Sequence, residues 1–188
     1  MPSRSTILCF AATNSAQSIN KRLVRHAAKV LQDELGVPVE IEIIDLNDYE
    51  MPIYSPEREA EGIPQLAQDF YDKIGACDGL IMSFAEYNGS YTAAFKNIFD
   101  WSSRIKMQIF QDKPALVMAT SKGGRGGKNV LEAATNGFPH FGANITSSFN
   151  FGPFSEHFDE QTDRLKTPEL ARDLREALLA FVAALPNR

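Results

Sequence analysis

The chain has 188 residues, of which 44% are hydrophobic and 23% are charged, and its formal net charge at pH 7 is −5. This length and composition favour one domain over residues 1–188 with a sizeable core. The negative charge and the lack of a basic run argue against a nucleic-acid surface, and no apolar stretch approaches the length of a membrane span.

Strand-like and helix-like segments alternate along the chain, as judged by the spacing of apolar side chains. In chain order, the pattern predicts a strand over residues 6–12, a helix over 18–34, a strand over 39–44, a helix that begins at Pro64, a strand over 79–84, a helix over 90–103, a strand over 114–120, a helix over 127–136, a strand over 143–150 and a helix over 168–185. Such alternation predicts a parallel sheet with helices on both faces.

Two of the predicted strands differ in character. Residues 39–44 alternate apolar and acidic side chains, which is typical of an edge strand, whereas residues 79–84 are apolar throughout and predict a central strand. Residues 45–62 carry Pro52, Pro56 and Gly62 and are predicted to form one long irregular connection. The pattern alone does not choose between the two common strand orders for such sheets.

The two cysteines indicate a reducing compartment. Cys9 lies inside an apolar run and Cys77 lies just before another, with neither metal-ligand spacing nor a C-x-x-C partner. We interpret both as small buried side chains. The apolar run that follows Arg4 is too short for a signal peptide, so a cytoplasmic protein is expected.

The loop after the first strand, residues 12–20, reads A-T-N-S-A-Q-S-I-N. Hydroxyls at Thr13, Ser15 and Ser18 converge there with main-chain N–H groups and a helix N-terminus, a combination that binds phosphate. Neither a dinucleotide-binding nor a nucleoside-triphosphate glycine pattern is present. Plain helix capping by Ser18 is the alternative interpretation of the same residues.

The loop after the third strand contains Tyr87-Asn88-Gly89-Ser90. The Asn88 amide can pair with both a donor and an acceptor, Tyr87 offers a ring, and Gly89 lets a main chain approach closely. These groups suit a flat polar ligand. The alternative is an Asn-Gly turn without a ligand, which is weakened because the turn follows a central strand rather than a hairpin.

The loop after the fourth strand, Ser121–Gly127, has four glycines in five positions. Ordering so many glycines is costly in backbone entropy, which predicts a close approach of some group to the main chain. Arg125 can clamp an anion or place positive charge near a ring. The alternative is a flexible surface loop with a solvated arginine.

The three loops follow the first, third and fourth strands. In the strand order 2-1-3-4-5 these strands are adjacent, so that their C-terminal ends share one crevice. One loop suits a phosphate and two suit a flat ring, which is the outline of FMN. We therefore expect an α/β fold with a five-stranded parallel sheet in the order 2-1-3-4-5, and FMN as the cofactor.

The chain resembles the NAD(P)H-dependent FMN reductases, flavodoxin-like flavoproteins with a three-layer sandwich fold that include quinone, azo-dye and chromate reductases. The family pattern G-S-x-R-x-x-S-x-N corresponds to residues 12–20. The pattern P-E-Y-N-x-S-x-P-G-x-L-K-N-x-x-D-W stands at residues 85–101 as A-E-Y-N-G-S-Y-T-A-A-F-K-N-I-F-D-W. The pattern S-x-G-G-x-G-G is complete at residues 121–127.

The resemblance implies a set of cofactor-binding residues. Those expected to hold the FMN phosphate are Thr13, Ser15, Ser18, Ile19 and Asn20. Those expected to border the isoalloxazine are Glu86, Tyr87, Asn88, Gly89, Ser121, Gly123, Gly124 and Arg125. The resemblance also implies a homodimer or homotetramer, with the helix of Lys96, Asp100 and Trp101 often at the subunit contact.

The chain departs from the family patterns at several positions. Ser15 stands where the first pattern has arginine, so that a cation expected near the phosphate is missing. Lys21 or Arg22 would compensate only if helical geometry lets either side chain point toward the loop. The usual proline is Ala85, and the usual Pro-Gly pair is replaced at residues 92–93, which loosens the turn.

Together these features predict an FMN-dependent NAD(P)H oxidoreductase. Hydride would pass from NAD(P)H to FMN, and then to a quinone, azo compound, metal oxyanion or free flavin in a ping-pong reaction. No catalytic side chain is expected, and the scattered His26, His140 and His157 indicate neither a triad nor a metal site. Two alternatives stay open: a flavodoxin-type one-electron carrier, and a flavin-binding sensor.

Overall fold

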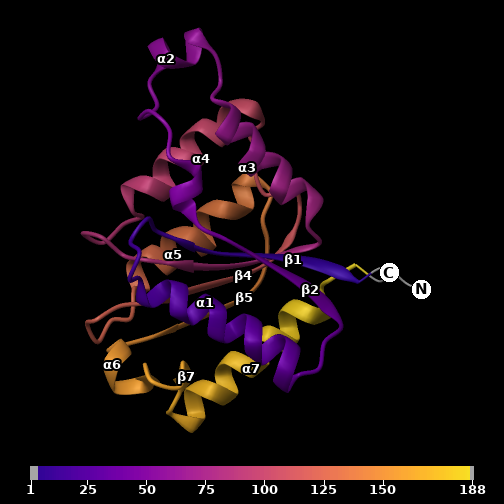
Figure 1. Cartoon of the computed structure of the whole chain (residues 1–188), viewed down its shortest axis with the longest axis vertical. Coiled ribbons are helices and arrows are strands. Elements are labelled where there is room, and N and C mark those ends of the chain that lie inside the picture. The colour runs from indigo at the N-terminus through magenta and orange to yellow at the C-terminus, as the bar shows by residue number, and fades with distance from the viewer. Residues whose placement is uncertain (1–3, 187–188) are drawn as a thin grey trace.

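Five parallel strands form the centre of the protein, in the order β2-β1-β3-β4-β5 (Figure 1). The structure is a computed structural model that describes residues 4–186. The strands are β1 (Ser5–Ala12), β2 (Val39–Ile44), β3 (Gly79–Phe84), β4 (Pro114–Thr120) and β5 (Asn144–Phe151). The predicted fold class and strand order are confirmed.

Helices cover both faces of the sheet, as Figure 1 shows. One face carries α1 (Ile19–Lys29), which continues as a π-helical turn over Val30–Glu34, together with α7 (Pro168–Ala183). The other face carries α3 (Gln65–Ala76), α4 (Ala93–Ile105) and α5 (Lys128–Gly137). Side chains of a strand alternate between the faces, so β1 sends Leu8 and Phe10 into one core and Ile7 and Cys9 into the other.

The burial of the strands follows their place in the sheet. Every residue of β3 and β4 is buried, because both strands have a neighbour on each side and helices on both faces. β2 lies at the edge, where Ile43 is 47% exposed. The predicted contrast between a central and an edge strand is thus confirmed.

Residues 45–62 are more ordered than the predicted irregular connection. They contain a 3-10 turn over Leu46–Tyr49 and the short helix α2 (Pro56–Glu61), which projects from the body of the protein (Figure 1). The Ser55 hydroxyl caps α2 by accepting the N–H of Arg58, and Pro56 occupies its first turn. The prediction was wrong here because a proline that breaks one helix also suits the start of another.

The helix predicted to start at residue 90 begins later, at Ala93. Tyr87 and Ser90 close a tight turn by exchanging main-chain hydrogen bonds of 3.0 and 3.1 Å, with Asn88 and Gly89 at positive φ between them. Thr92 then caps α4, since its Oγ1 accepts the N–H of Phe95 at 3.2 Å. The polar stretch is therefore a turn followed by a cap.

The segment after β5 contains elements that the sequence analysis did not predict. A short helix, α6 (Phe154–His157), precedes a hairpin of β6 (Phe158–Asp159) and β7 (Arg164–Leu165). Phe154 and Phe158 are buried in the core between the sheet and α1 and α7. Within residues 4–186, no helix has the length and apolar character needed to cross a membrane.

Candidate functional site

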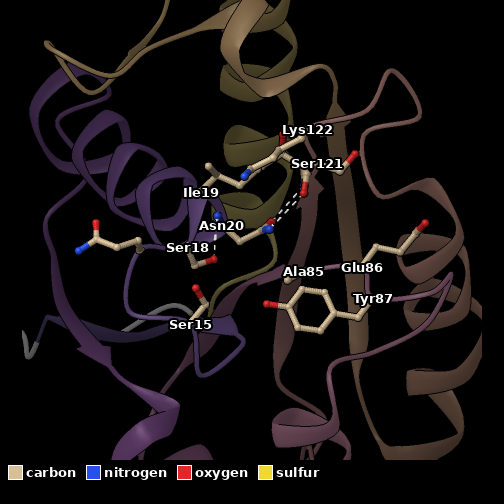
Figure 2. A pocket seen from close by; sticks show the side chains of 11 residues that line it. Ser15, Ser18, Ile19, Asn20, Ala85, Glu86, Tyr87, Ser121 and Lys122 are labelled. Atoms are coloured by element: carbon tan, nitrogen blue, oxygen red, sulfur yellow. Dashed lines mark hydrogen bonds between the residues drawn. The ribbon is translucent and has the colours of Figure 1, made fainter.

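A crevice of about 480 Å³ lies at the C-terminal edge of β1, β3 and β4 (Figure 2). Its lining residues come from the three loops that follow these strands: Ser15, Gln17, Ser18, Ile19 and Asn20; Ala85, Glu86 and Tyr87; and Thr120, Ser121 and Lys122. The parallel strand order brings these loops together, since all three leave the sheet at the same edge. The volume lies in the range of small-molecule sites.

The loop between β1 and α1 divides its polar side chains between two tasks. Ser15 and Ser18 line the crevice, and Ser18 Oγ also caps α1 by accepting the N–H of Asn20 at 3.2 Å. Thr13 is fully buried, and its Oγ1 accepts the N–H of Ser15 at 3.2 Å. Thr13 thus shapes the loop from inside, whereas the two serines present hydroxyls to the crevice.

Asn20 joins α1 to the ends of β3 and β4. It is 2% exposed, and its Oδ1 accepts from Ser83 Oγ at 2.7 Å and from the N–H of Thr120 at 3.1 Å. Its Nδ2 donates to the carbonyl oxygen of Thr120 at 3.1 Å. Both ends of the amide are engaged within the protein, so Asn20 fixes the floor of the crevice.

The loop between β3 and α4 presents a ring and an anchored carboxylate. Figure 2 shows the Tyr87 ring reaching toward the side of Ser15, while the Glu86 carboxylate points away from the crevice. Glu86 accepts the N–H of Val130 at 3.0 Å and a hydrogen bond from Asn129 at 3.4 Å. The carboxylate thus satisfies the N-terminus of α5, where the helix dipole favours negative charge.

The tip of this turn lies beyond the crevice lining. Asn88 and Gly89 are exposed and adopt positive φ, and neither is among the residues that line the crevice. Tyr87 is 51% exposed. The Tyr87 ring therefore lies at the mouth of the crevice, and the turn at Asn88 and Gly89 fixes the main chain beside it.

The glycines of the loop between β4 and α5 serve different purposes. A side chain at Gly126 would lie 2.5 Å from the main chain of Phe151, and one at Gly127 would lie 2.9 Å from the Ala119 methyl group. Both glycines also have positive φ. Gly123 and Gly124 have open space around them. The predicted close approach is therefore made by the protein itself at two of the four glycines.

Arg125 is tied to α5 rather than to the crevice lining. Its Nη2 donates to Asn129 Oδ1 at 2.5 Å, and Asn129 in turn donates to Glu86. The chain Arg125–Asn129–Glu86 links the loops that follow β4 and β3. Sequence reasoning missed Asn129, because Arg125 lies in the turn before α5 and Asn129 in its first turn, and only the path of the loop brings the two side chains together.

Neither cation considered as a replacement for the missing arginine reaches the crevice. Lys21 pairs with Asp45 at 2.5 Å, and Arg22 pairs with Asp163 at 2.9 Å. Burial alone would raise the pKa of the Asp45 carboxyl, but hydrogen bonds from Lys21 and Asn47 outweigh it and hold the pKa below its usual value. Lys21 therefore has a firmly ionised partner.

Neither Cys9 nor Cys77 lines the crevice. Cys9 and Cys77 are buried and free of disulfides, and burial raises the pKa of both thiols, that of Cys77 to about 11. Both are thus inert in their thiol form. Among residues 4–186, no three His, Cys, Asp or Glu side chains are grouped to hold a metal ion.

The sequence pattern at residues 85–101 continues into α4, where its side chains hold the segment 51–54. Asn97 Oδ1 accepts the N–H of Tyr54 at 2.8 Å, and its Nδ2 donates to the carbonyl oxygen of Met51 at 3.0 Å. Trp101 Nε1 donates to the carbonyl oxygen of Pro52 at 2.7 Å. These contacts leave Ile53 75% exposed. The Asn and Trp of the motif thus hold a projecting apolar residue.

Comparison with known proteins places these features in a family context. The family model described as NADPH-dependent FMN reductase matches residues 5–157. An NAD(P)H-dependent FMN reductase of Pseudomonas aeruginosa is 36% identical over 96 residues, which cover 50% of this chain and 51% of that protein. A protein named NADH-dependent flavin reductase subunit 2, from Lactobacillus johnsonii, is 26% identical over 94% of this chain and 95% of its own.

A solved structure supports the fold over nearly the full length. The flavoenzyme NAD(P)H:(acceptor) oxidoreductase FerB from Paracoccus denitrificans matches with a TM-score of 0.73 at 23% identity, covering 95% of this chain and 96% of its own. The match extends the likeness beyond residue 157 to the C-terminal helix. The alignment with the Pseudomonas reductase, in contrast, spans about half the length of either protein.

Proposed function

Because the chain belongs to the NADPH-dependent FMN reductase family, we propose that it binds FMN in the crevice and acts as an FMN-dependent NAD(P)H oxidoreductase. One observation carries the proposal: loops from three adjacent strands line a single crevice of about 480 Å³. The crevice combines serine hydroxyls and a helix N-terminus from the loop after β1 with an aromatic ring from the loop after β3, and Ser121 and Lys122 line it from the loop after β4. Gly123 and Gly124 lie beyond the lining.

The phosphate end fits a phosphate monoester. Ser15 and Ser18 contribute hydroxyls, and the Ile19 N–H stands at the first position of α1, where a helix leaves this group without a partner. The N–H groups of Asn20 and Lys21 already donate to the Ser18 hydroxyl and carbonyl oxygens at 3.2 and 3.1 Å. The positive end of the helix dipole favours an anion at this place. Ile19 is the first residue of α1 and lines the crevice. Thr13 and Asn20 would act from beneath, through the hydrogen bonds that hold the loop.

The ring end fits a flat heterocycle. Ala85 and Tyr87 supply an apolar and an aromatic wall (Figure 2). Ser121 lines the crevice from the loop after β4, and its hydroxyl donates to the Gly123 carbonyl oxygen at 3.0 Å. Gly123 and Gly124 are exposed, and a side chain at either would meet no atom within 4 Å, which leaves room for a ligand beside them. The Gly123 carbonyl oxygen is already engaged, since it accepts from Ser121 Oγ and from the Gly126 N–H. In this assignment Glu86 and Arg125 border the ring indirectly, through the hydrogen bonds to Asn129, and Asn88 and Gly89 place the Tyr87 ring.

The protein positions the cofactor and supplies its electrostatic surroundings. When bound, FMN provides the hydride and electron chemistry between NAD(P)H and an acceptor. The glycine loop would stabilise negative charge through its main-chain N–H groups. Tyr87 is half exposed at the mouth of the crevice, and nicotinamide and acceptor would bind in turn at this one opening. Such alternate binding would give ping-pong kinetics. The acceptor would be a quinone, azo compound, metal oxyanion or free flavin.

The proposal is tested with the purified protein. We expect a yellow protein, or one that FMN renders yellow, that bleaches with NADPH in the absence of air and regains colour when a quinone is added. Initial rates at several acceptor concentrations should give parallel double-reciprocal lines. A colourless protein that FMN cannot reconstitute would contradict the proposal. Flavin binding without NADPH oxidation, when no partner reductase is present, would favour the one-electron carrier.

We also propose that the functional unit is a homodimer or homotetramer of one domain, residues 1–188, in the cytoplasm. The exposed Ile53, fixed by Asn97 and Trp101, offers an apolar contact next to α4. Light scattering on the purified protein tests the assembly. A monomer at micromolar concentration would contradict it, and replacement of Ile53 by Asp should weaken it.

A further inference from the structure

The free charge on the crevice wall is positive. Glu86 and Lys122 are the oppositely charged residues of the lining. The Glu86 carboxylate is engaged by Val130 and Asn129 at the start of α5. Lys122 is exposed, and among residues 4–186 it has neither an ion-pair partner nor a side-chain hydrogen bond. An anionic ligand would therefore meet one uncommitted ammonium group.

Other cations near the phosphate end are engaged elsewhere. Lys21 pairs with Asp45 and Arg22 with Asp163, and neither lines the crevice. Arg125, in the same loop as Lys122, donates to Asn129 on α5. A phosphate at Ser15 and Ser18 would thus rest on neutral donors unless a charge reaches it from across the crevice.

The Lys122 side chain points toward the part of the crevice where α1 begins. Figure 2 shows it extending from the loop after β4 toward Ile19, at the start of α1. The flexible stem of a lysine delivers a compact charge that suits phosphate without requiring a fixed geometry. We infer that Lys122 binds the phosphate of FMN from the wall opposite Ser15 and Ser18, and so makes the site selective for FMN over riboflavin. This inference rests on the proposed function.

The test measures flavin affinity rather than turnover. Protein freed of flavin is titrated with FMN and with riboflavin, and flavin fluorescence reports binding. In Lys122→Gln the Kd for FMN should rise about fivefold to tenfold, while the Kd for riboflavin stays unchanged. The FMN affinity of the wild type should also fall more steeply with added salt than that of the variant.

Two further variants serve as controls. Lys128→Gln removes a lysine six residues away that pairs with Glu132 and does not line the crevice, so FMN binding should not change. Lys122→Arg keeps the charge and should retain most of the preference for FMN. Because Lys122 and Lys128 are both exposed, Lys122→Gln, Lys122→Arg and Lys128→Gln should unfold thermally at the same temperature as the wild type.

The flavin titrations distinguish failure of the proposed function from failure of the inference about Lys122. If the wild type binds neither flavin, the proposed function itself is contradicted. If the wild type prefers FMN and Lys122→Gln keeps the same ratio of the two Kd values, the inference about Lys122 is overturned while the function stands. A variant that changes only the preference for NADPH over NADH would place the lysine at the 2′-phosphate of the nicotinamide substrate and likewise overturn it.

Discussion

The loops after β1 and β4 face each other across the crevice and differ in how they use their polar and glycine residues. In the first loop, Thr13 Oγ1 accepts the N–H of Ser15 and Asn20 Nδ2 donates to the Thr120 carbonyl oxygen, which holds the main chain in place, and Ser15 and Ser18 face the crevice. In the second, Gly126 and Gly127 pack against neighbouring main chain and side chain, and Gly123 and Gly124 stay open. Each loop therefore combines residues that hold the main chain in place with residues that face the crevice or stay exposed.

Among the residues that hold the first loop in place, Asn20 is expected to contribute most to stability. Asn20→Ala removes the partner of Ser83 Oγ and of the Thr120 N–H, both buried, and should lower the free energy of unfolding by about 3 kcal/mol. Urea denaturation measures the loss. Asn14→Ala, an exposed asparagine in the same loop, is the matched control and should change stability by less than about 0.5 kcal/mol. If Asn20→Ala lowers the free energy of unfolding no more than Asn14→Ala does, the Asn20 hydrogen bonds do not stabilise the loop.

The two kinds of glycine in the second loop can be separated in the same way. Gly126→Ala introduces a methyl group 2.5 Å from the main chain of Phe151 at a positive φ, and should destabilise the protein by about 2 kcal/mol. Gly124→Ala has open space and should be nearly neutral in stability. Thermal unfolding of both variants decides the point. A destabilised Gly124→Ala would show that the whole loop is structurally constrained.

Ser15 tests the ligand-facing side of the first loop. Ser15→Ala should leave the midpoint of thermal unfolding unchanged and raise the Kd for FMN about fivefold, equivalent to roughly 1 kcal/mol. Fluorescence titration measures the affinity. Ser155→Ala, an exposed serine outside the crevice lining, should bind FMN as the wild type does. An unchanged Kd in Ser15→Ala would remove this hydroxyl from the phosphate site.

The smallest expected effect is the pH dependence of stability that His26, a buried residue of α1, contributes. Burial lowers the pKa of His26, with Glu34 and Asp163 opposing and Arg164 adding to that shift, and its Nδ1 has no partner among residues 4–186. The unfolded chain then binds a proton more readily than the folded protein. Stability should therefore be complete above pH 6.5 and decline as the pH falls from there toward the lower folded-state pKa.

His26→Phe keeps a ring beside Phe158, whose centroid lies 5.6 Å from that of His26, and removes the titrating group. Urea denaturation at several pH values should show a flatter stability profile between pH 6.5 and 5 in this variant. A wild-type profile that rises toward acid would contradict the sign of the shift.

Sequence patterns sufficed for the sheet because strand order and burial follow from long-range regularities. The apolar runs at β3 and β4 need helices on both faces, and the loops after β1, β3 and β4 can share a ligand only if these strands are neighbours. The hairpin of β6 and β7 was missed because two-residue strands leave no periodicity to detect.

The site was predictable at the level of loops and less so at the level of side chains. Thr13 and Ser15 are two residues apart in one polar loop, yet one is buried and the other faces the crevice. Only the path of the main chain decides this direction. Lys122 stands at a variable position of the third pattern, so the pattern gave no reason to single it out.

Whether FMN occupies the crevice can be seen in a crystal structure of the protein co-crystallised with FMN. We expect one FMN per chain in the crevice, with its phosphate between Ser15, Ser18 and Lys122 and its ring system between Tyr87 and Ser121. Density for FMN elsewhere, or with the phosphate at the opposite end of the crevice, would contradict it.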